Sequence, residues 1–178
     1  MFDVTWAPPA AADDSSFVAA LCELINDAYD RAEAGLWREA IGRTSAIDVA
    51  SRLRTGDVLI AMDHDHPVGS VFTRQLDDQT AWFGALAVCP DSSRRGVGRA
   101  LVDRCEQRAI DLGSIRMQLE VLAPRQGHEH TTRLAAWYQR LGYTETERAA
   151  LDQREPELAG FLLHDCDLVV CHKPLSGR

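Results

Sequence analysis

The chain has 178 residues and a formal net charge of −8, and 46% of its residues are hydrophobic and 26% charged. These values predict one folded domain, residues 1–178, and exclude a disordered chain. The negative charge argues against a general nucleic-acid binder and suits a cationic substrate, and no apolar run approaches the length needed to span a membrane.

The first half of the sequence predicts a strand, two helices and an antiparallel meander. Phe2–Trp6 alternates apolar and polar residues, as a short strand does. A helix capped by residues 13–15 runs through Tyr29, and a second helix covers Ser45–Arg54. The meander has strands at 58–62, 68–76 and 80–88, joined by turns at Asp63–Pro67 and Asp77–Asp78.

Helices and strands alternate in the predicted second half. Helices are expected at Gly96–Leu112 and Thr131–Leu141, each followed by a glycine that can end it. Residues 149–163 fit neither periodicity, and 154–157 suggest an exposed insertion. The order of elements predicts an α/β mixture whose first half is mostly antiparallel. Strands are expected at Arg116–Leu122, from Tyr143 onward and at Cys166–Lys173.

The stretch Leu86–Leu101 carries the clearest chemical signal. A strand ends at Val88, a polar turn follows, and Gly96 and Gly98 open a helix. Free backbone N–H groups at such a helix start bind phosphate, and glycines let the ligand approach closely. The alternative is an ordinary helix start with solvated arginines at positions 94, 95 and 99.

Two common phosphate-binding motifs are missing from this stretch. A Walker-type loop needs Gly-Lys-Ser or Gly-Lys-Thr, which the sequence lacks. A dinucleotide-binding turn needs a strand leading directly into it and a third small residue, where this chain has Leu101. The sequence therefore disfavours a nucleotide kinase and a dehydrogenase.

Two segments resemble motifs of the GNAT acetyltransferase superfamily. Ser93–Gly98 is similar to that family's pyrophosphate turn, although the family has Gln or Arg where this chain has Ser93. Leu134–Tyr143 is similar to a later family motif, an amphipathic helix with a tyrosine four residues before a Gly-Tyr or Gly-Phe pair; here that tyrosine is Tyr138. The resemblance covers about residues 80–145.

The resemblance implies a fold, a cofactor and a reaction. The fold is a mixed, mostly antiparallel sheet of six to seven strands flanked by about four helices. An acetyl group would pass from acetyl-CoA to a primary amine of a small molecule or peptide within a ternary complex. Thr131 stands where many members have an asparagine that contacts the coenzyme. The residues implied in coenzyme binding are Leu86, Ala87, Val88, Arg94, Arg95, Gly96, Val97, Gly98, Arg99, Ala100, Thr131 and Tyr138.

Acetyl transfer to an amine needs a proton donor for the leaving thiolate and a way to deprotonate the amine. The resemblance places Tyr138 beside the coenzyme sulfur as the donor, and the alternative is a core aromatic residue. Glu120 is the candidate base, with an ion pair as its alternative role, and residues 128–130 (His-Glu-His) or water could also take the proton. Glu33, together with Tyr29, lies where this fold forms its acceptor wall.

Other interpretations stay open at this point. Cys89 beside the turn suggests a covalent route, although no base is evident near it. A protein that binds acyl-CoA without catalysis would keep the same turn. No metal is expected, because His64–His66 and His128–His130 lack a further ligand at suitable spacing. The apolar final strand could pair between two copies in a homodimer.

Cysteine usage and the first residues bear on the compartment. The five cysteines form no Cys-x-x-Cys pair, and residues 1–14 carry three aspartates and no basic region. Reduced thiols and a start unlike a secretory signal predict a cytoplasmic protein. The cysteines are Cys22, Cys89, Cys105, Cys166 and Cys171.

Overall fold

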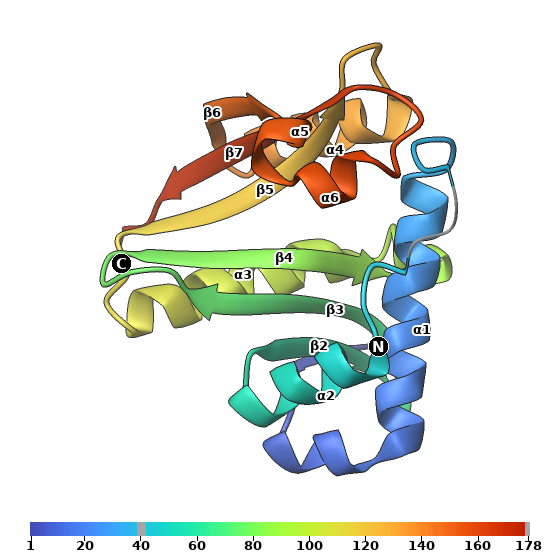
Figure 1. Ribbon diagram of the computed structural model, residues 1–178. Helices are drawn as coiled ribbons and strands as arrows, with labels where there is room; N and C mark the ends of the chain where they lie inside the picture. The colour runs from blue at the N-terminus through green and yellow to red at the C-terminus, as the bar shows by residue number, and fades with distance from the viewer. Residues whose placement is uncertain (39–41, 177–178) are drawn as a thin grey trace.

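The computed structural model describes residues 1–38 and 42–176, which form a seven-stranded sheet with helices on both faces (Figure 1). The strand order is β1-β2-β3-β4-β5-β7-β6; the β4–β5 pair is parallel and the other five pairs are antiparallel. The predicted mixed, mostly antiparallel sheet is confirmed. Its strands are β1 (Asp3–Trp6), β2 (Val58–Asp63), β3 (His66–Gln75), β4 (Thr80–Val88), β5 (Arg116–Pro124), β6 (Thr144–Ala150) and β7 (Cys166–Pro174).

Four longer helices and two single-turn helices accompany the sheet in the described residues. The longer ones are α1 (Ser15–Ala32), α2 (Ala46–Thr55), α3 (Val97–Asp111) and α4 (Glu129–Arg140); the short ones are α5 (Leu151–Arg154) and α6 (Pro156–Ala159). Two 3-10 turns, η1 (Pro9–Asp13) and η2 (Pro90–Ser92), complete the list. None of the helices within 1–38 and 42–176 has the length and apolarity that crossing a bilayer requires.

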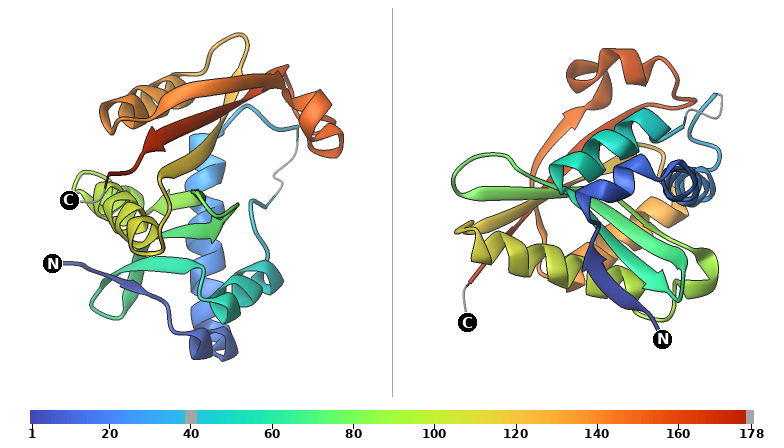
Figure 2. Two further views of the ribbon diagram at one scale, coloured as in Figure 1. Left: turned by 90° about the vertical axis from the view of Figure 1, so that its left-hand side faces the viewer. Right: turned by 90° about the horizontal axis from the view of Figure 1, so that it is seen from below.

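The helices lie in two layers because both faces of the sheet are apolar. Successive side chains of a strand point to opposite faces. In β2, Leu59 and Ala61 therefore pack in one core with α3 and α4, whereas Val58 and Ile60 pack in another with α1 and α2. Figure 2 shows these two helix layers on either side of the strands.

The helix ends follow from local chemistry. Asp14 caps α1 by accepting hydrogen bonds from the backbone N–H groups of Ser16 and Phe17, both at 3.0 Å. Ser45 and Asp48 form a capping box at the start of α2. Gly113, with φ +89°, follows α3 in the left-handed conformation that ends many helices, as predicted.

Several predicted boundaries were wrong by a few residues. The first hairpin turn is only His64–Asp65, because β2 extends to Asp63 and β3 begins at His66. Helix α4 begins at Glu129 rather than Thr131. Residues 154–157, predicted as an exposed insertion, are exposed; Arg154 ends α5, Glu155 lies between the two single-turn helices, and residues 156 and 157 begin α6.

The sheet opens between β4 and β5. The two strands pair only where Thr80–Trp82 faces Arg116–Gln118 and then diverge, as Figure 1 shows. The register between β3 and β4 shifts after Ser70, and Ala85 has a φ of +49°, which marks a bulge in β4. Beyond Trp82, the edge of β4 that faces β5 is therefore left without strand pairing in the described chain.

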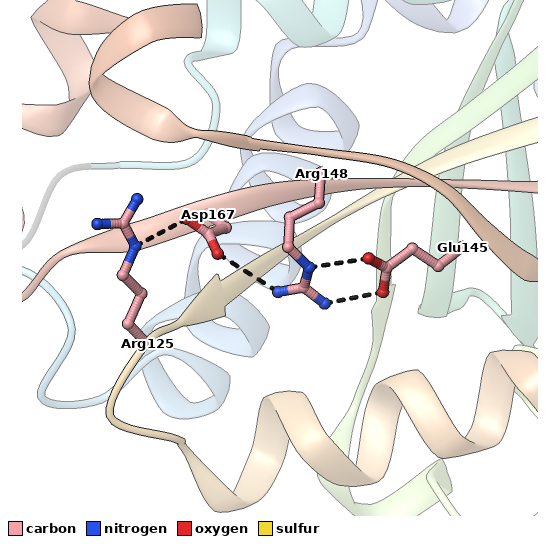
Figure 3. Close-up of polar contacts among 4 residues, drawn as sticks. All are labelled: Arg125, Glu145, Arg148 and Asp167. Carbon is pink, nitrogen blue, oxygen red and sulfur yellow. Dashed lines mark hydrogen bonds and ion pairs between the residues drawn. The ribbon is translucent and has the colours of Figure 1, made fainter.

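Strand β7 is an interior strand, paired with β5 on one side and β6 on the other. The predicted route to a homodimer through this strand is therefore wrong, because both of its edges are already paired. Figure 3 shows charged side chains joining the same three strands: Asp167 on β7 accepts from Arg125 at 2.9 Å and pairs with Arg148 at 3.5 Å, and Arg148 also pairs with Glu145 at 2.8 Å.

Candidate active site

The opening between β4 and β5 is a cleft of about 460 Å³, bordered by α1, α4 and the α5–α6 segment. It collects residues that the sequence placed in three separate roles: coenzyme binding, proton transfer and acceptor binding. The predicted residues that line the cleft are Tyr29, Glu33, Leu86, Val88, Gly98, Glu120, Thr131 and Tyr138.

The other predicted coenzyme residues do not line this cleft. Ala87 is 2% exposed and packs in the core on the α1 and α2 side of the sheet. Val97 is fully buried, and a Cβ on Gly69 would lie 2.8 Å from its side chain, which shows how closely α3 packs on β3. The remaining residues outside the cleft lining are Arg94, Arg95, Gly96, Arg99 and Ala100.

The N-terminus of α3 is an uncapped helix end beside the cleft. Gly96 takes a left-handed φ of +82°, no side chain caps the helix, and its first turn has no acidic residue. The backbone N–H of Ala100 donates to the carbonyl of Gly96 at 3.0 Å, so the N–H groups of residues 97–99 have no acceptor within the helix. Their dipoles and the helix dipole favour an anion there.

Gly98 brings that helix end close to the mouth of the cleft. A Cβ on Gly98 would lie 3.6 Å from Val88 and 3.8 Å from the ring of Trp137. These are ordinary van der Waals distances, and Gly98 has no unusual backbone angle, so the packing of the described chain would accept a Cβ there; its absence leaves the mouth of the cleft more open. Ser93 occupies the position where the resembled motif has Gln or Arg. It also lines the cleft, and its hydroxyl donates to the carbonyl of Pro90 at 2.8 Å.

Three arginines lie in the glycine turn (residues 93–98) or directly after it, and they differ in their side-chain partners. Arg95 donates to Asp63 at 2.6 Å, and Arg99 donates from Nε to Asp103 at 2.7 and 2.8 Å. Arg94 is exposed, and no ion pair or side-chain hydrogen bond joins it to the described residues. Arg94 is thus the arginine of this group whose charge is not already paired within the described protein.

Tyr138 lies on α4 with its side chain 6% exposed, and it lines the cleft. Its ring centroid is 4.9 Å from that of Trp137, 5.8 Å from Tyr143 and 6.0 Å from Phe83. Burial raises the pKa of Tyr138 above its ordinary value. The hydroxyl therefore stays protonated in the physiological range and can donate a proton or a hydrogen bond.

Of the three residues 128–130, only His130 lines the cleft. Burial, followed by the charges of Arg133 and His128, lowers the pKa of His130, so its imidazole is neutral at pH 7. His128 lies 3.3 Å from the carbonyl oxygen of Ala34. Glu129 pairs with Arg133 at 3.1 Å on the surface.

Glu120 and Thr131 line the cleft from β5 and α4. The Glu120 side chain is exposed and accepts a hydrogen bond from Gln118 at 3.4 Å. Thr131 donates its hydroxyl to the carbonyl of His128 at 3.0 Å, which supports the first turn of α4. The Thr131 oxygen keeps acceptor capacity toward the cleft.

The far end of the cleft combines a half-buried carboxylate with aromatic rings. Trp37 donates its indole N–H to Glu33 at 2.6 Å. Burial raises the pKa of Glu33, while Arg43, Trp37 and His128 act in the opposite direction. The Arg43 guanidinium carbon lies 4.4 Å from the centroid of the Tyr29 ring. Tyr29 and Glu33, the predicted acceptor residues, are thus brought together.

The sequence did not identify several residues that line this cleft. In the sequence, Trp37 is only an aromatic residue four positions after Glu33, and Glu155 falls in the predicted exposed insertion. No motif marked the others, because they come from loops, a strand and a single-turn helix that meet only in the folded chain. These residues are Trp37, Arg43, Trp82, Glu155 and Leu158.

Cys89 is not among the residues that line the cleft, so the covalent route has no geometric support. Its backbone N–H donates to the carbonyl of Val68 at 2.9 Å, which continues the sheet pairing.

Across residues 1–38 and 42–176, no cluster of three or more His, Cys, Asp or Glu side chains is placed to hold a metal ion.

The cleft thus joins an anion-binding helix end, a free strand edge and a buried tyrosine hydroxyl, a combination that suits a group-transfer enzyme with an extended, phosphate-bearing cofactor. Residues 54–145, more than half of the chain, match the family model of the acetyltransferase (GNAT) domain. The chain belongs to the GNAT acetyltransferase family. It matches no curated protein sequence.

Solved structures share the fold over the whole chain. The PaiA N-acetyltransferase of Thermoplasma acidophilum, in complex with coenzyme A, has a TM-score of 0.72 at 14% identity, covering 98% of this chain and 99% of that one. The ribosomal-protein-S18-alanine N-acetyltransferase of Escherichia coli has a TM-score of 0.67 at 18% identity, covering 100% of this chain and 96% of that one. YncA of Salmonella typhimurium, with its cofactor acetyl-CoA, has a TM-score of 0.68 at 15% identity, covering 100% of this chain and 96% of that one.

Proposed function

We propose that this protein transfers an acetyl group from acetyl-CoA to a primary amine in a ternary complex. The observation that carries the proposal is that the uncapped start of α3 and the buried Tyr138 border one cleft, between strands that have separated. Acyl transfer from a coenzyme A thioester requires an anion-binding site for the cofactor's phosphates and a proton donor for its leaving thiolate. The two similar structures with bound coenzyme A or acetyl-CoA support the choice of cofactor.

The proposed coenzyme site follows the cleft from the glycine turn inward. The N–H groups of residues 97–99 would hold the pyrophosphate, with Arg94 adding charge. The unpaired edge of β4 at Leu86–Val88 would bind the pantetheine amides as a strand binds a neighbour. Gly98 leaves room for this path, and Thr131 borders it from α4.

The reaction needs one bond formed, one bond broken and two proton transfers, one from the amine to a base and one from an acid to the leaving thiolate. The amine nitrogen attacks the thioester carbonyl carbon, the C–N bond forms, and the C–S bond breaks. Tyr138 donates its proton to the leaving thiolate. We assign acceptance of the amine proton to His130, because a neutral imidazole is a suitable base near pH 7. Glu120 faces the same space and would stabilise the cationic amine before it reacts.

The acceptor would enter from the end formed by Tyr29 and Glu33. A carboxylate with a raised pKa, held by an indole N–H beside aromatic rings, suits an ammonium group better than an anion.

The five cysteines are free thiols in the structure, which agrees with the proposed cytoplasmic location.

The test measures thiol release with acetyl-CoA over a panel of amines, in parallel with coenzyme binding. Tyr138→Phe should lower kcat by about 100-fold, the effect of losing one general acid, while the Kd for coenzyme A changes little. Tyr143→Phe is the matched control, because its hydroxyl donates to Glu106 at 2.7 Å and the side chain does not line the cleft. Equal rates in wild type and Tyr138→Phe would remove Tyr138 from the mechanism. Tight coenzyme binding without thiol release on any amine would favour a protein that binds acyl-CoA without catalysis.

A further inference from the structure

A recess of about 200 Å³ opens from the acceptor end of the cleft. It lies between the C-terminal end of α1 and helix α6. Five of its lining residues also line the cleft, so the two spaces are continuous: Tyr29, Glu33, Trp37, Arg43 and Leu158. A molecule bound in the cleft can therefore extend into the recess.

The recess already holds one positive charge, supplied by the protein itself. The guanidinium of Arg43 lies over the ring of Tyr29, 4.4 Å from its centroid, within the range in which a cation is attracted to an aromatic face. The same Arg43 charge acts on Glu33. The geometry thus places a cation on the face of Tyr29, in a recess that the Glu33 carboxylate also lines.

Glu33 retains capacity for a further donor. Within the described chain, its side chain accepts one hydrogen bond, from the indole N–H of Trp37. A carboxylate has about four lone-pair sites. An ammonium group that reaches Glu33 could therefore be bound there without breaking the bond from Trp37.

The charges around both spaces favour a cation over an anion. Four carboxylates outnumber the basic side chains among the described lining residues. Arg43 is the only arginine or lysine in that set, and His130 is neutral at pH 7. The carboxylates are those of Asp30, Glu33, Glu120 and Glu155.

We propose that this recess is a second cation subsite, formed by Tyr29, Glu33 and Trp37, and that the acceptor is an amine carrying a second cationic group. The second cation would replace Arg43 on the face of Tyr29, while the reacting amine lies deeper in the cleft near Tyr138. Arg43 then acts as a selectivity residue that a monocationic amine cannot displace. The inference rests on the proposed acetyl transfer for its reacting end, although the binding subsite can be tested without it.

The first experiment compares linear α,ω-diamines, from diaminopropane to diaminohexane, with monoamines of the same carbon number. In wild type, kcat/KM should favour the best diamine by about tenfold, the equivalent of one added charged contact. Glu33→Gln should bring this ratio close to one. Glu23→Gln is the matched control, because Glu23 is an exposed carboxylate on the same helix and lines neither space, so it should leave the ratio unchanged.

Arg43→Gln separates the proposal from its main competitor. If Arg43 occupies the cation subsite, its removal should raise the ratio in favour of diamines. If amines that carry a carboxylate are the better acceptors, and Arg43→Gln abolishes their advantage, then Arg43 binds an anion and the proposal is overturned.

Calorimetric titration of the protein saturated with coenzyme A distinguishes failure of this proposal from failure of the proposed reaction. Diamine binding that weakens in Glu33→Gln supports the subsite even if no amine is acetylated. Equal binding of diamine and monoamine in wild type overturns it, whatever the turnover.

Discussion

Arg95 donates to Asp63 at 2.6 Å and so ties the glycine turn to the end of β2. The guanidinium of Arg95 also lies 5.9 Å from the ring of Phe2, and it holds the pKa of Asp63 below its ordinary value. Arg95 is therefore occupied in bracing the turn. In the proposed coenzyme site, the positive charge beside the phosphates would come instead from Arg94 and from the backbone N–H groups of α3.

Replacing Arg94 should weaken coenzyme binding more than replacing Arg99. We expect Arg94→Gln to raise the Kd of coenzyme A about fivefold, or about 1 kcal/mol, and to reduce its salt dependence, because an exposed charge contributes on that scale. Arg99→Gln is the matched control, since Asp103 already pairs with Arg99. Titrations at two salt concentrations check this, and equal effects of the two variants would contradict it.

Gly96 should contribute to both stability and coenzyme binding. Its φ is +82°, so Gly96→Ala should lower the free energy of unfolding by about 1 kcal/mol and distort the anion site. Gly113→Ala is the control, because Gly113 has a φ of +89° at the other end of the same helix. Denaturant unfolding should show similar losses for both variants, and only Gly96→Ala should bind coenzyme A more weakly. Weakened binding in both would mean that general destabilisation is the cause.

Gly98 should act on binding alone. A Cβ there meets atoms only at 3.6 Å or beyond, so a larger residue is tolerated by the fold but occupies the coenzyme path. Gly98→Glu should reduce coenzyme affinity by about 100-fold or more, because its carboxylate lies beside the anion-binding N–H groups. Gly98→Gln separates charge from size, and unchanged binding in Gly98→Glu would place the coenzyme elsewhere.

The elements that the sequence predicted well are those that local chemistry determines. The bounds of β4 were correct at both ends, because a nearly continuous apolar run lies between the Asp77–Asp78 turn and Pro90. The uncapped start of α3 was visible in Gly96 and Gly98. The backbone freedom of a glycine depends on the residue itself, so the sequence alone shows where it is available.

The residues that the sequence missed depend on contacts between distant segments. The partner of Arg95 lies 32 positions earlier, at the end of another strand, so its charge seemed available to a phosphate. The single-turn helices α5 and α6 are too short to show a helical period. Leu158 on α6 and Glu155 between the two helices reach the cleft because this segment lies against the loop after α1, where Trp37 forms a bridge with Leu162.

His130 should determine the acidic limb of the pH dependence of kcat/KM. Burial lowers the pKa of His130, so its active neutral form is lost as the pH falls, with a midpoint below the ordinary value of about 6.5. His130→Gln should flatten this limb and lower kcat/KM by about 100-fold at pH 7. Glu120→Gln should keep the limb. If instead only Glu120→Gln removes it, Glu120 is the base.

A partly buried ion pair joins α3 to β7. Glu106 accepts from Lys173 at 2.6 Å and from the hydroxyl of Tyr143 at 2.7 Å, and the two charged side chains are only 12% and 22% exposed. The ring of Tyr143 lies 5.8 Å from that of Tyr138. This group therefore links the chain just after α4 to α3 and β7.

Removing one partner of this ion pair should destabilise the protein more than removing both. Glu106→Leu leaves the Lys173 charge uncompensated in a mostly buried position, so the free energy of unfolding should fall by about 3 kcal/mol. The double variant Glu106→Leu with Lys173→Met removes both charges and should recover most of that loss, because no unpaired charge remains. Denaturant unfolding of wild type, the two single variants and the double variant provides the measurement. If the two single losses simply add in the double variant, the two side chains do not act as a unit.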